Sequence, residues 1–238
     1  KLLVTCALLA YAVNQINFSE LVLILSDFNP IYFGLAFGLQ FCLSFLQSTR
    51  WRLILYDVDR PLSHFAAWRN VLIGLFFNQT LPSSVGGDAI RIYCARSIGL
   101  RLAFSSIIID RIIALFTLAA VALGISLYFS VSKTQLPHNS IMIVAEAFAI
   151  TCVICLLFSE KIFTIIGIDR YFELEKIRFF CRTLEKFYQN KTRVVSSIFL
   201  SLIIHFFVSV SAIFLFLGTG SDVSPILIGF IFALISLF

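Results

Sequence analysis

Charged residues are scarce in this chain. Only 13% of its 238 residues are Asp, Glu, Lys or Arg, whereas a typical soluble domain has roughly 25%. The hydrophobic fraction is 60% and the mean hydropathy is +0.98. This composition excludes an ordinary soluble domain and indicates an integral membrane protein.

Proline is also rare, with 5 residues in the whole chain, and the apolar stretches are long and continuous. They lack the alternation over segments of about ten residues that a membrane β-barrel requires. We therefore expect an all-α fold, a polytopic bundle of transmembrane helices.

The chain begins at Lys1, and its only methionine is Met142. The last apolar run, residues 225–238, is shorter than the roughly 20 residues that a span needs. We interpret residues 1–238 as a single integral membrane domain that is truncated at both ends.

Six apolar runs are candidates for membrane segments. They are residues 2–16, 31–49, 104–129, 140–158, 194–217 and 225–238. Basic residues in short loops stay on the cytoplasmic side, and here they gather at Lys1 and in the ranges 50–69, 96–101 and 161–193. The charge pattern fits a cytoplasmic N-terminus only if residues 70–100 enter and leave on the same side, so it predicts a re-entrant hairpin there.

The composition of residues 70–100 suggests how this hairpin forms. Residues 71–77 are too few to cross the bilayer. Pro82 lacks an amide hydrogen, and Gly86-Gly87 permits dihedral angles that break a helix. We expect a descending helix, a polar tip, and a helix that returns over residues 89–96. Irregular backbone at membrane depth occurs only inside protein or beside a watery cavity.

Two further segments have apolar residues at helical spacing. The loop over residues 159–193 carries Ile177, Phe180, Leu184 and Phe187 among basic residues. This pattern is typical of a cytoplasmic amphipathic helix on the inner leaflet, or of a solvated connecting helix. Residues 19–28 predict a weaker interfacial helix on the opposite side.

Four charged residues in or near the hairpin are candidates for an anion site. Asp88 and Arg91 stand three apart, so they share a helix face and can pair. Ser83 and Ser84 resemble a helix N-cap region, where free backbone amides attract anions. Asp110 and Arg111 diverge on their helix, and plausible partners are Arg91 for Asp110 and Asp88 for Arg111. The cluster is either a headgroup site or a structural ion pair that pins the hairpin, or both.

Other polar residues have weaker interpretations. Glu146 and His205 lie in predicted spans and are candidates for a proton relay, although a lone histidine is more often a packing residue. Arg50, Trp51 and Arg52 predict an interface anchor, with a headgroup contact as the second interpretation.

The sequence offers little for catalysis or for other ligands. The three histidines are not spaced as a zinc site, and Ser83 lacks the flanking glycines of a nucleophile elbow. Six cysteines lie in or beside apolar segments and are interpreted as core residues. We expect no enzymatic activity, no metal and no cofactor. The net charge of +5 is explained by the cytoplasmic loops, so no nucleic acid is needed.

The segment from Phe76 to Arg91, with Gly99 and the following Asp110-Arg111, resembles the lysylphosphatidylglycerol synthase transmembrane-region family of flippase-like membrane proteins. Its string is Asn-x-x-Leu-Pro-Ser-x-x-Gly-Gly-Asp-x-x-Arg. The resemblance implies a helical bundle with re-entrant helices. It also implies that the chain moves an anionic or aminoacylated phospholipid, or a lipid-linked headgroup, across a bacterial or archaeal inner membrane.

The chain departs from the family pattern because it holds no soluble synthase domain and no second Pro-Gly-Gly motif. Two alternatives stay open: a membrane partner that presents lipid to a synthase or glycosyltransferase, and a scaffold with a structural charge cluster. The partners implied are membrane lipids and such enzymes. The residues expected to contact the lipid are Asn78, Pro82, Ser83, Ser84, Gly86, Gly87, Asp88, Arg91, Asp110 and Arg111.

Overall fold

The computed structural model describes residues 17–55, 62–80, 84–131, 151, 174–220 and 228. Within these residues there are seven α-helices, one short 3-10 helix and no strand, which confirms the all-α class. The predicted membrane segments 2–16, 140–158 and 225–238 lie outside the described residues, apart from Thr151 and Ile228. Pro82, Ser83 and Glu146 lie outside them as well.

Three described helices are long and apolar enough to cross a membrane. They are α3 (Pro30–Ile54), α10 (Lys191–Gly218) and the first 22 residues of α6 (Leu100–Val131). Large apolar side chains remain exposed along them, including Phe37 at 56% and Phe206 at 64%. Such surface is unfavourable in water and favourable against lipid tails. The predicted polytopic membrane bundle is therefore confirmed, with α3 ending five residues later than expected.

Asparagine side chains set the start of three helices. Asn17 precedes α2 (Phe18–Ser26) and accepts a hydrogen bond from the Ser19 amide. Asn29 does the same for α3, which has Pro30 at its first position, and Asn190 does so for α10. An N-cap side chain satisfies one of the free amides of the first turn. These capping hydrogen bonds set the residue at which each helix begins.

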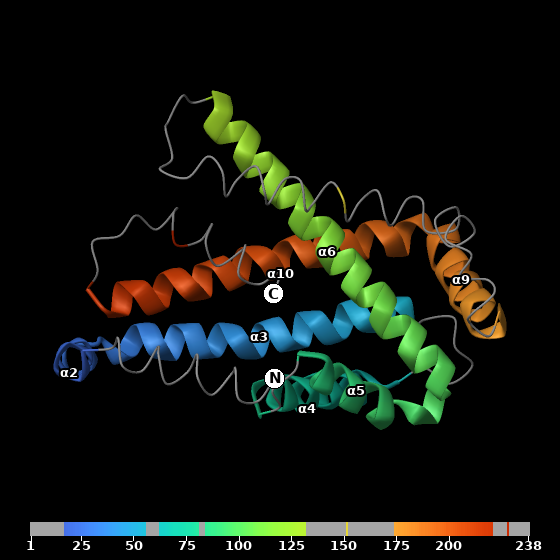
Figure 1. Cartoon of the computed structure of the whole chain (residues 1–238), viewed down its shortest axis with the longest axis horizontal. Coiled ribbons are helices and arrows are strands. Elements are labelled where there is room, and N and C mark those ends of the chain that lie inside the picture. The colour runs from blue at the N-terminus through green and yellow to red at the C-terminus, as the bar shows by residue number, and fades with distance from the viewer. Residues whose placement is uncertain are drawn as a thin grey trace.

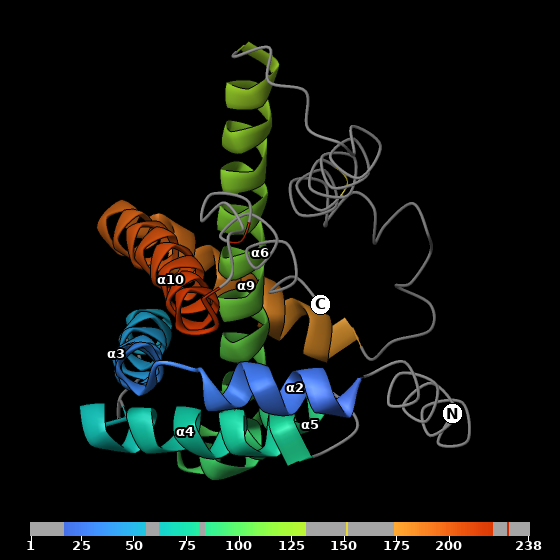
Figure 2. The same cartoon turned by 90° about the vertical axis from the view of Figure 1, so that its left-hand side faces the viewer.

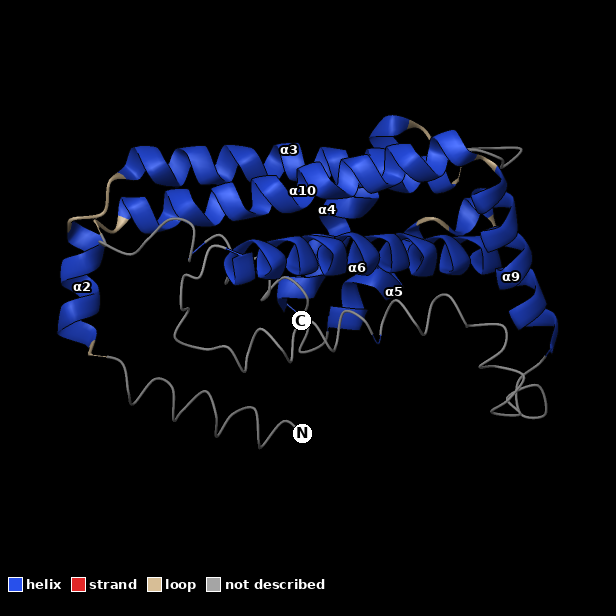
Figure 3. Ribbon diagram, turned by 90° about the horizontal axis from the view of Figure 1, so that it is seen from above, coloured by secondary structure: helices blue, strands red, loops and turns tan. Residues whose placement is uncertain are grey.

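Helices α3 and α10 lie side by side along most of their length, and α6 crosses them (Figure 1). Seen from the end in Figure 2, α6 stands beside the α3–α10 pair, with α4 and α5 at its base. At one end the pair is tied by the Asn29 amide, which donates to the Gly218 carbonyl at 3.0 Å. At the other end α9 (Leu174–Gln189) packs against α6 and α10 (Figure 3).

Helix α9 contains the apolar residues expected to make an amphipathic helix. Phe187 is buried against Ile54, Ile109 and Ile113, while Arg182 is exposed. The predicted helix is therefore confirmed. Its position on the inner leaflet stays a prediction.

The segment predicted to form a hairpin contains α4 (His64–Thr80) and α5 (Ser84–Cys94). The two helices run antiparallel, since Gly74 lies beside Arg91 and Asn78 lies beside Gly87. Neither is among the described helices that could span a membrane. That the pair dips into the bilayer and returns stays a prediction.

One expectation about this segment is wrong. Gly86 and Gly87 do not interrupt a helix, because α5 begins at Ser84 and includes both. The returning helix therefore starts five residues earlier than predicted and ends at Cys94. The missing Cβ atom serves close packing instead, as described below. After α5 the chain forms the short η1 (Arg96–Ile98), and Gly99, which has a φ of 95°, separates η1 from α6.

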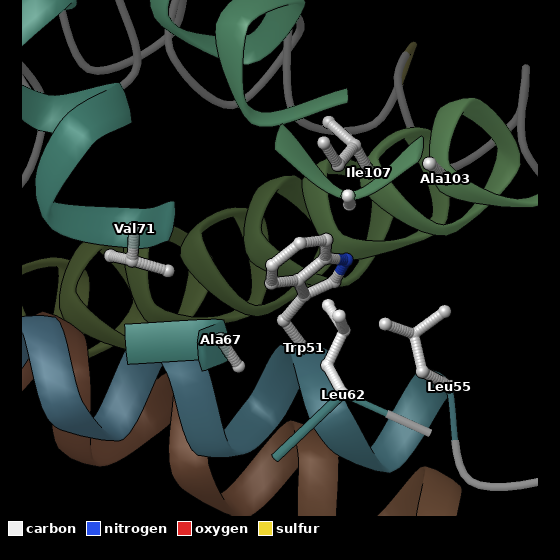
Figure 4. Packing of buried hydrophobic residues seen from close by; sticks show 8 residues of the cluster. Trp51, Leu55, Leu62, Ala67, Val71, Ala103 and Ile107 are labelled. Atoms are coloured by element: carbon white, nitrogen blue, oxygen red, sulfur yellow. The ribbon is translucent and has the colours of Figure 1, made fainter. Parts of the chain in front are cut away.

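Trp51 forms the centre of the apolar core between α3, α4 and α6 (Figure 4). Its ring is fully buried, and its Nε1 donates to the Ser106 hydroxyl at 3.0 Å. Leu55, Val71 and Ile107 pack in the same cluster. The expectation that Trp51 anchors the chain at the membrane interface is therefore wrong. A buried indole is favoured here because both its ring and its N–H find partners.

Candidate functional site

A polar cavity of about 170 Å³ lies where five helices meet. Helix α3 contributes Gln47 and Arg50, α5 contributes Arg91, and α6 contributes Asp110 and Arg111. Helix α6 also contributes Ala114, and the remaining lining comes from α4 and α10 and consists of Val71, Gly74, Leu75, Asn78, Ile204, His205 and Val208. The cavity therefore has one charged side and one mostly apolar side.

Five charged side chains form a connected cluster at this cavity. Asp110 accepts from Arg50 Nε at 2.8 Å and lies 3.9 Å from Arg91 Nη2. Asp88 contacts Arg91 at 3.4 Å and Arg111 at 2.8 Å. The pairings predicted for Asp110 with Arg91 and for Asp88 with Arg111 are confirmed. Three arginines against two aspartates leave one excess positive charge.

Exposure rises across the cluster from the inside outward. The side chains of Arg50 and Asp110 are 6% and 5% exposed, and that of Arg91 is 10% exposed. Asp88 is 17% exposed and Arg111 is 52% exposed. The Arg50–Asp110 pair is thus the most buried part of the cluster, and Arg111 is its most exposed member.

Arg50 was expected to anchor the chain at the interface, and this expectation is wrong. It is 5% exposed, bonds to Asp110, and also donates from Nη1 to the Ser201 hydroxyl on α10. A buried charge is tolerated only when it is paired and hydrogen-bonded. Arg50 therefore joins α3, α6 and α10 at the base of the cavity.

Arg91 is the side chain in the cluster with unused hydrogen-bonding capacity. Its Nε and Nη2 have no hydrogen-bond partner in the described part of the protein, although both atoms are buried. Its guanidinium carbon lies 4.7 Å from the centre of the Trp51 ring, a cation–π distance. Unpaired buried N–H groups cost about 1–3 kcal/mol each. The position of Arg91 is thus one that an anion in the cavity would stabilise.

Two glycines let α5 approach α4 closely. A Cβ on Gly74 would lie 2.6 Å from Cγ and Cδ of Arg91. A Cβ on Gly87 would collide with the Asn78 side chain and the Gly74 carbonyl. Asn78 Oδ1 also accepts from the Gly87 amide at 2.9 Å, which satisfies a free donor in the first turn of α5. The helix contact therefore holds Arg91 in place against the cavity.

His205 lies on α10 at the apolar side of the cavity and is half-buried. Its Nε2 is 3.2 Å from the Ala114 carbonyl oxygen and 3.3 Å from Thr117 Oγ1. Both neighbours are on α6, so the histidine also links the two crossing helices.

The sequence pattern described as the lysylphosphatidylglycerol synthase TM region matches residues 1–238. The chain belongs to the lysylphosphatidylglycerol synthase transmembrane-region family. The family assignment covers the cluster, the α4–α5 pair and all candidate spans together.

Curated relatives of this family member are archaeal membrane proteins. A UPF0104 membrane protein of Methanocaldococcus jannaschii is 29% identical over 251 residues, covering 95% of this chain and 72% of that protein. A UPF0104 membrane protein of Methanothermobacter thermautotrophicus is 27% identical over 110 residues, covering 45% of this chain and 31% of that protein. No solved structure matches the chain.

The structure of this family member brings together most of the residues predicted to contact lipid. Asp88, Arg91, Asp110 and Arg111 form the cluster, and Asn78 lines the same cavity. Gly87 packs beneath Asn78, and Gly86 and Ser84 lie in the first turn of α5. Pro82 and Ser83 lie outside the described residues. The lipid-contacting role of all these residues stays a prediction.

Sequence reasoning missed three residues of the site. Arg50 and Trp51 were assigned to the interface because they end an apolar run on the basic side. Gly74 was not singled out at all. Arg50 is followed by more basic residues in sequence, so its charge alone gives no sign of burial. The predicted cluster of two aspartates and two arginines was already balanced in charge, so it gave no signal that Asp110 has a second partner in Arg50.

The arginines that line the cavity make an anion the ligand best suited to this arrangement. Arginine guanidinium groups match phosphate oxygens with paired N–H donors. The cavity offers Arg91 and Arg111 at its charged side, while Asp110 is already paired with Arg50. A buried Arg91 and a half-exposed Arg111 beside apolar residues suit a phosphate that is attached to a lipid.

Proposed function

We propose that this protein translocates an anionic or aminoacylated phospholipid, or a lipid-linked headgroup, between the leaflets of the membrane. The observation that carries the proposal is the buried Arg91, whose Nε and Nη2 have no hydrogen-bond partner among the described residues. A lipid phosphate entering the cavity would supply acceptors for both atoms.

The shape of the cluster supports a transient site for phosphate. Arg111, which is 52% exposed, is the first cation that a headgroup would meet. Arg91 lies deeper, and Asp110 with Arg50 closes the base. In this proposal Asp88 orients the two outer arginines. A headgroup would move from Arg111 to Arg91 while its acyl chains remain in the lipid.

The proposal places the α4–α5 pair as a re-entrant element in the inner membrane of a bacterial or archaeal cell. Its polar residues would line a cavity open to the cytoplasmic side. Polar groups at membrane depth are tolerated where they face protein or a water-filled cavity. The three candidate spans would surround this cavity and keep lipid tails out of it.

The test uses liposomes that contain the purified protein and a trace of phosphatidylglycerol with a fluorophore on one acyl chain. A membrane-impermeant reductant bleaches the fluorophore in the outer leaflet only. We expect the wild-type protein to let bleaching proceed past one half, because lipid from the inner leaflet becomes accessible. Arg91→Ala should return bleaching to the level of protein-free liposomes.

Arg182→Ala is the matched control, because Arg182 is an exposed arginine on α9 away from the cavity. It should behave as wild type. Aminoacylated phosphatidylglycerol is tested in parallel, and leaflet-resolved labelling of both lipids is repeated in cells. The proposal fails if folded Arg91→Ala protein moves both lipids as fast as wild type. Binding without movement, together with co-purification of a synthase or glycosyltransferase, would favour the lipid-presenting alternative.

A further inference from the structure

His205 is a titratable group that lines the same cavity as the arginines but is not needed to hold a phosphate. It lies on α10, while Arg91 lines the cavity from α5. The charged groups that face the cavity with it are Arg50 on α3, Arg91 on α5, and Asp110 and Arg111 on α6. Helix α9 contributes no residue to the lining.

The hydrogen bonds of His205 indicate which ring nitrogen is basic. Thr117 Oγ1 lies 2.9 Å from the carbonyl oxygens of Ile113 and Ala114, so its hydrogen is used within its own helix. The Ala114 carbonyl can only accept. Nε2 of His205 faces both of these oxygens and therefore carries a hydrogen. Nδ1 is the atom left to take up a second proton.

The electrostatics of the lining link this proton to the anion. The cluster at the cavity holds three arginines and two aspartates, Asp88 lying just outside the lining, so an empty cavity opposes a further positive charge on His205. A phosphate in the cavity would offset that repulsion. The cavity of about 170 Å³ is small enough that any ion within it lies close to every lining side chain. Interaction between ions at such short range is strong in a protein interior.

We infer that His205 is a proton-binding site that couples protonation to anion binding in this cavity, so that phosphate and proton enter together. This inference rests on the proposed function. Thermodynamic linkage makes the effect reciprocal, since whatever favours protonation when the anion binds must favour the anion when the proton binds. A proton that travels with the lipid phosphate would connect movement of the lipid to the proton gradient.

The experiment measures anion affinity against pH with a built-in reporter. The chain has two tryptophans, and Trp51 lies against the Arg91 guanidinium. Trp68→Phe leaves Trp51 as the only tryptophan, so its fluorescence reports occupation of the cavity. The probe is short-chain phosphatidylglycerol added to protein in a neutral detergent. Its phosphodiester has no second ionisation near pH 6, unlike a phosphomonoester, so a change in affinity reports a group on the protein.

We expect the affinity to rise roughly tenfold as the pH falls from 8 to 5, through the range in which histidine titrates. The rise has this sign because the anion stabilises the protonated histidine. His205→Gln keeps a hydrogen-bond donor for Ala114 but cannot titrate there. At every pH, this variant should bind the lipid with the affinity that the reporter protein with His205 intact shows at pH 8.

His64→Gln is the matched control, because His64 is exposed at the start of α4 and pairs with Arg52 outside the cavity. It should keep the full pH dependence. Proton uptake by protein that retains His205, followed with a pH indicator in weak buffer, should reach at most about half a proton per lipid bound, the amount that a tenfold linkage allows. This second measurement does not depend on whether His205→Gln folds.

The possible failures are distinguishable. If Arg91→Ala does not weaken binding at any pH, the proposed function fails. If Arg91→Ala weakens binding but the affinity is independent of pH, or if His205→Gln retains the dependence, the coupling through His205 is overturned while the anion site stands. Absence of proton uptake on binding overturns the coupling as well.

Discussion

At the scale of single residues, this protein shows how neighbours in sequence acquire different roles through burial. Arg50 and Arg52 are separated by one residue on α3. Arg50 is 5% exposed and bonds to Asp110, while Arg52 donates from Nε to the Leu62 carbonyl at 2.9 Å. Trp51 points to a third side, into the apolar core. Successive residues on a helix point about 100° apart, so Arg50, Trp51 and Arg52 cannot all face the same membrane interface.

Arg50 provides a prediction about stability. Replacing it by Met leaves the buried Asp110 with Arg91 alone, whose Nη2 is 3.9 Å away. Removing one partner of a buried pair costs about 3–5 kcal/mol. We expect Arg50→Met to lower the thermal unfolding temperature in detergent clearly. Arg111→Met, at a side chain that is 52% exposed, should lower it much less. If both substitutions lowered the unfolding temperature by the same small amount, Arg50 would not be part of the core.

At the scale of helices, the contact between α4 and α5 depends on two absent side chains. Gly74 leaves room for the stem of Arg91, and Gly87 leaves room for Asn78. Glycine lowers helix stability by about 1 kcal/mol relative to alanine. Here that cost is offset by the close approach of the two helices, which puts Asn78 within hydrogen-bonding distance of the Gly87 amide.

These glycines give a second prediction, with different outcomes at the two sites. Gly87→Ala places a Cβ against backbone and a fixed side chain, so we expect a loss of about 1–3 kcal/mol in unfolding free energy. Gly74→Ala meets the flexible stem of Arg91 at 2.6 Å. It should cost less stability but displace Arg91 and weaken binding of phosphatidylglycerol.

Gly38→Ala is the control for both substitutions, because no atom lies within 4 Å of its Cβ position on α3. It should be neutral or stabilising by about 0.5–1 kcal/mol, as expected where only helix propensity changes. The measurements are thermal unfolding in detergent and the Trp51 fluorescence titration. A Gly87→Ala variant as stable as Gly38→Ala would contradict the packing described for α4 and α5.

At the scale of the whole molecule, the arrangement of helices concentrates charge at one place in an otherwise apolar bundle. Helices α3, α6 and α10 supply long apolar surfaces, and they cross where Arg50, Asp110 and Ser201 meet. Helices α4 and α5 complete the cavity from one side. Because α3, α5 and α6 each bring charged side chains to the cluster, removing any one of these three helices would leave charges without their partners.

The position of the α4–α5 pair in the membrane gives a prediction at this scale. If the pair enters and leaves on the cytoplasmic side, residues before α4 and after α5 face the same compartment. In a cysteine-free background, Ser63→Cys and Arg96→Cys should react with an impermeant maleimide only in inside-out vesicles. Asp27→Cys, at the exposed end of α2, should react only from the opposite side.

Labelling of Ser63→Cys and Arg96→Cys from opposite sides would show that the segment crosses the membrane. The pair would then not be re-entrant, and the proposed opening of the cavity to the cytoplasm would lose its basis. Labelling of all three positions from one side would instead contradict the assignment of α3 as a span.

Composition and local sequence pattern were sufficient to predict the fold class, most described helices and two ion pairs of this protein. Low charge and long apolar runs indicate a helical membrane bundle, and the described helices α3, α6 and α10 match the predicted spans within a few residues. The amphipathic spacing indicates α9. The pairs Asp88–Arg111 and Arg91–Asp110 were predictable because a buried charge needs an opposite charge, and few are available in apolar sequence.

Tertiary structure alone decided which residues complete the site. Whether Gly86-Gly87 breaks a helix or packs inside one depends on a partner surface, and Gly74 provides that surface 13 positions earlier in the chain. Whether Arg50 faces the membrane surface or the core depends on Asp110 and Ser201, which lie 60 and 151 positions away. Sequence determines what each residue is able to pair with, because that is a property of its own atoms. Which pairs form depends on how the helices cross.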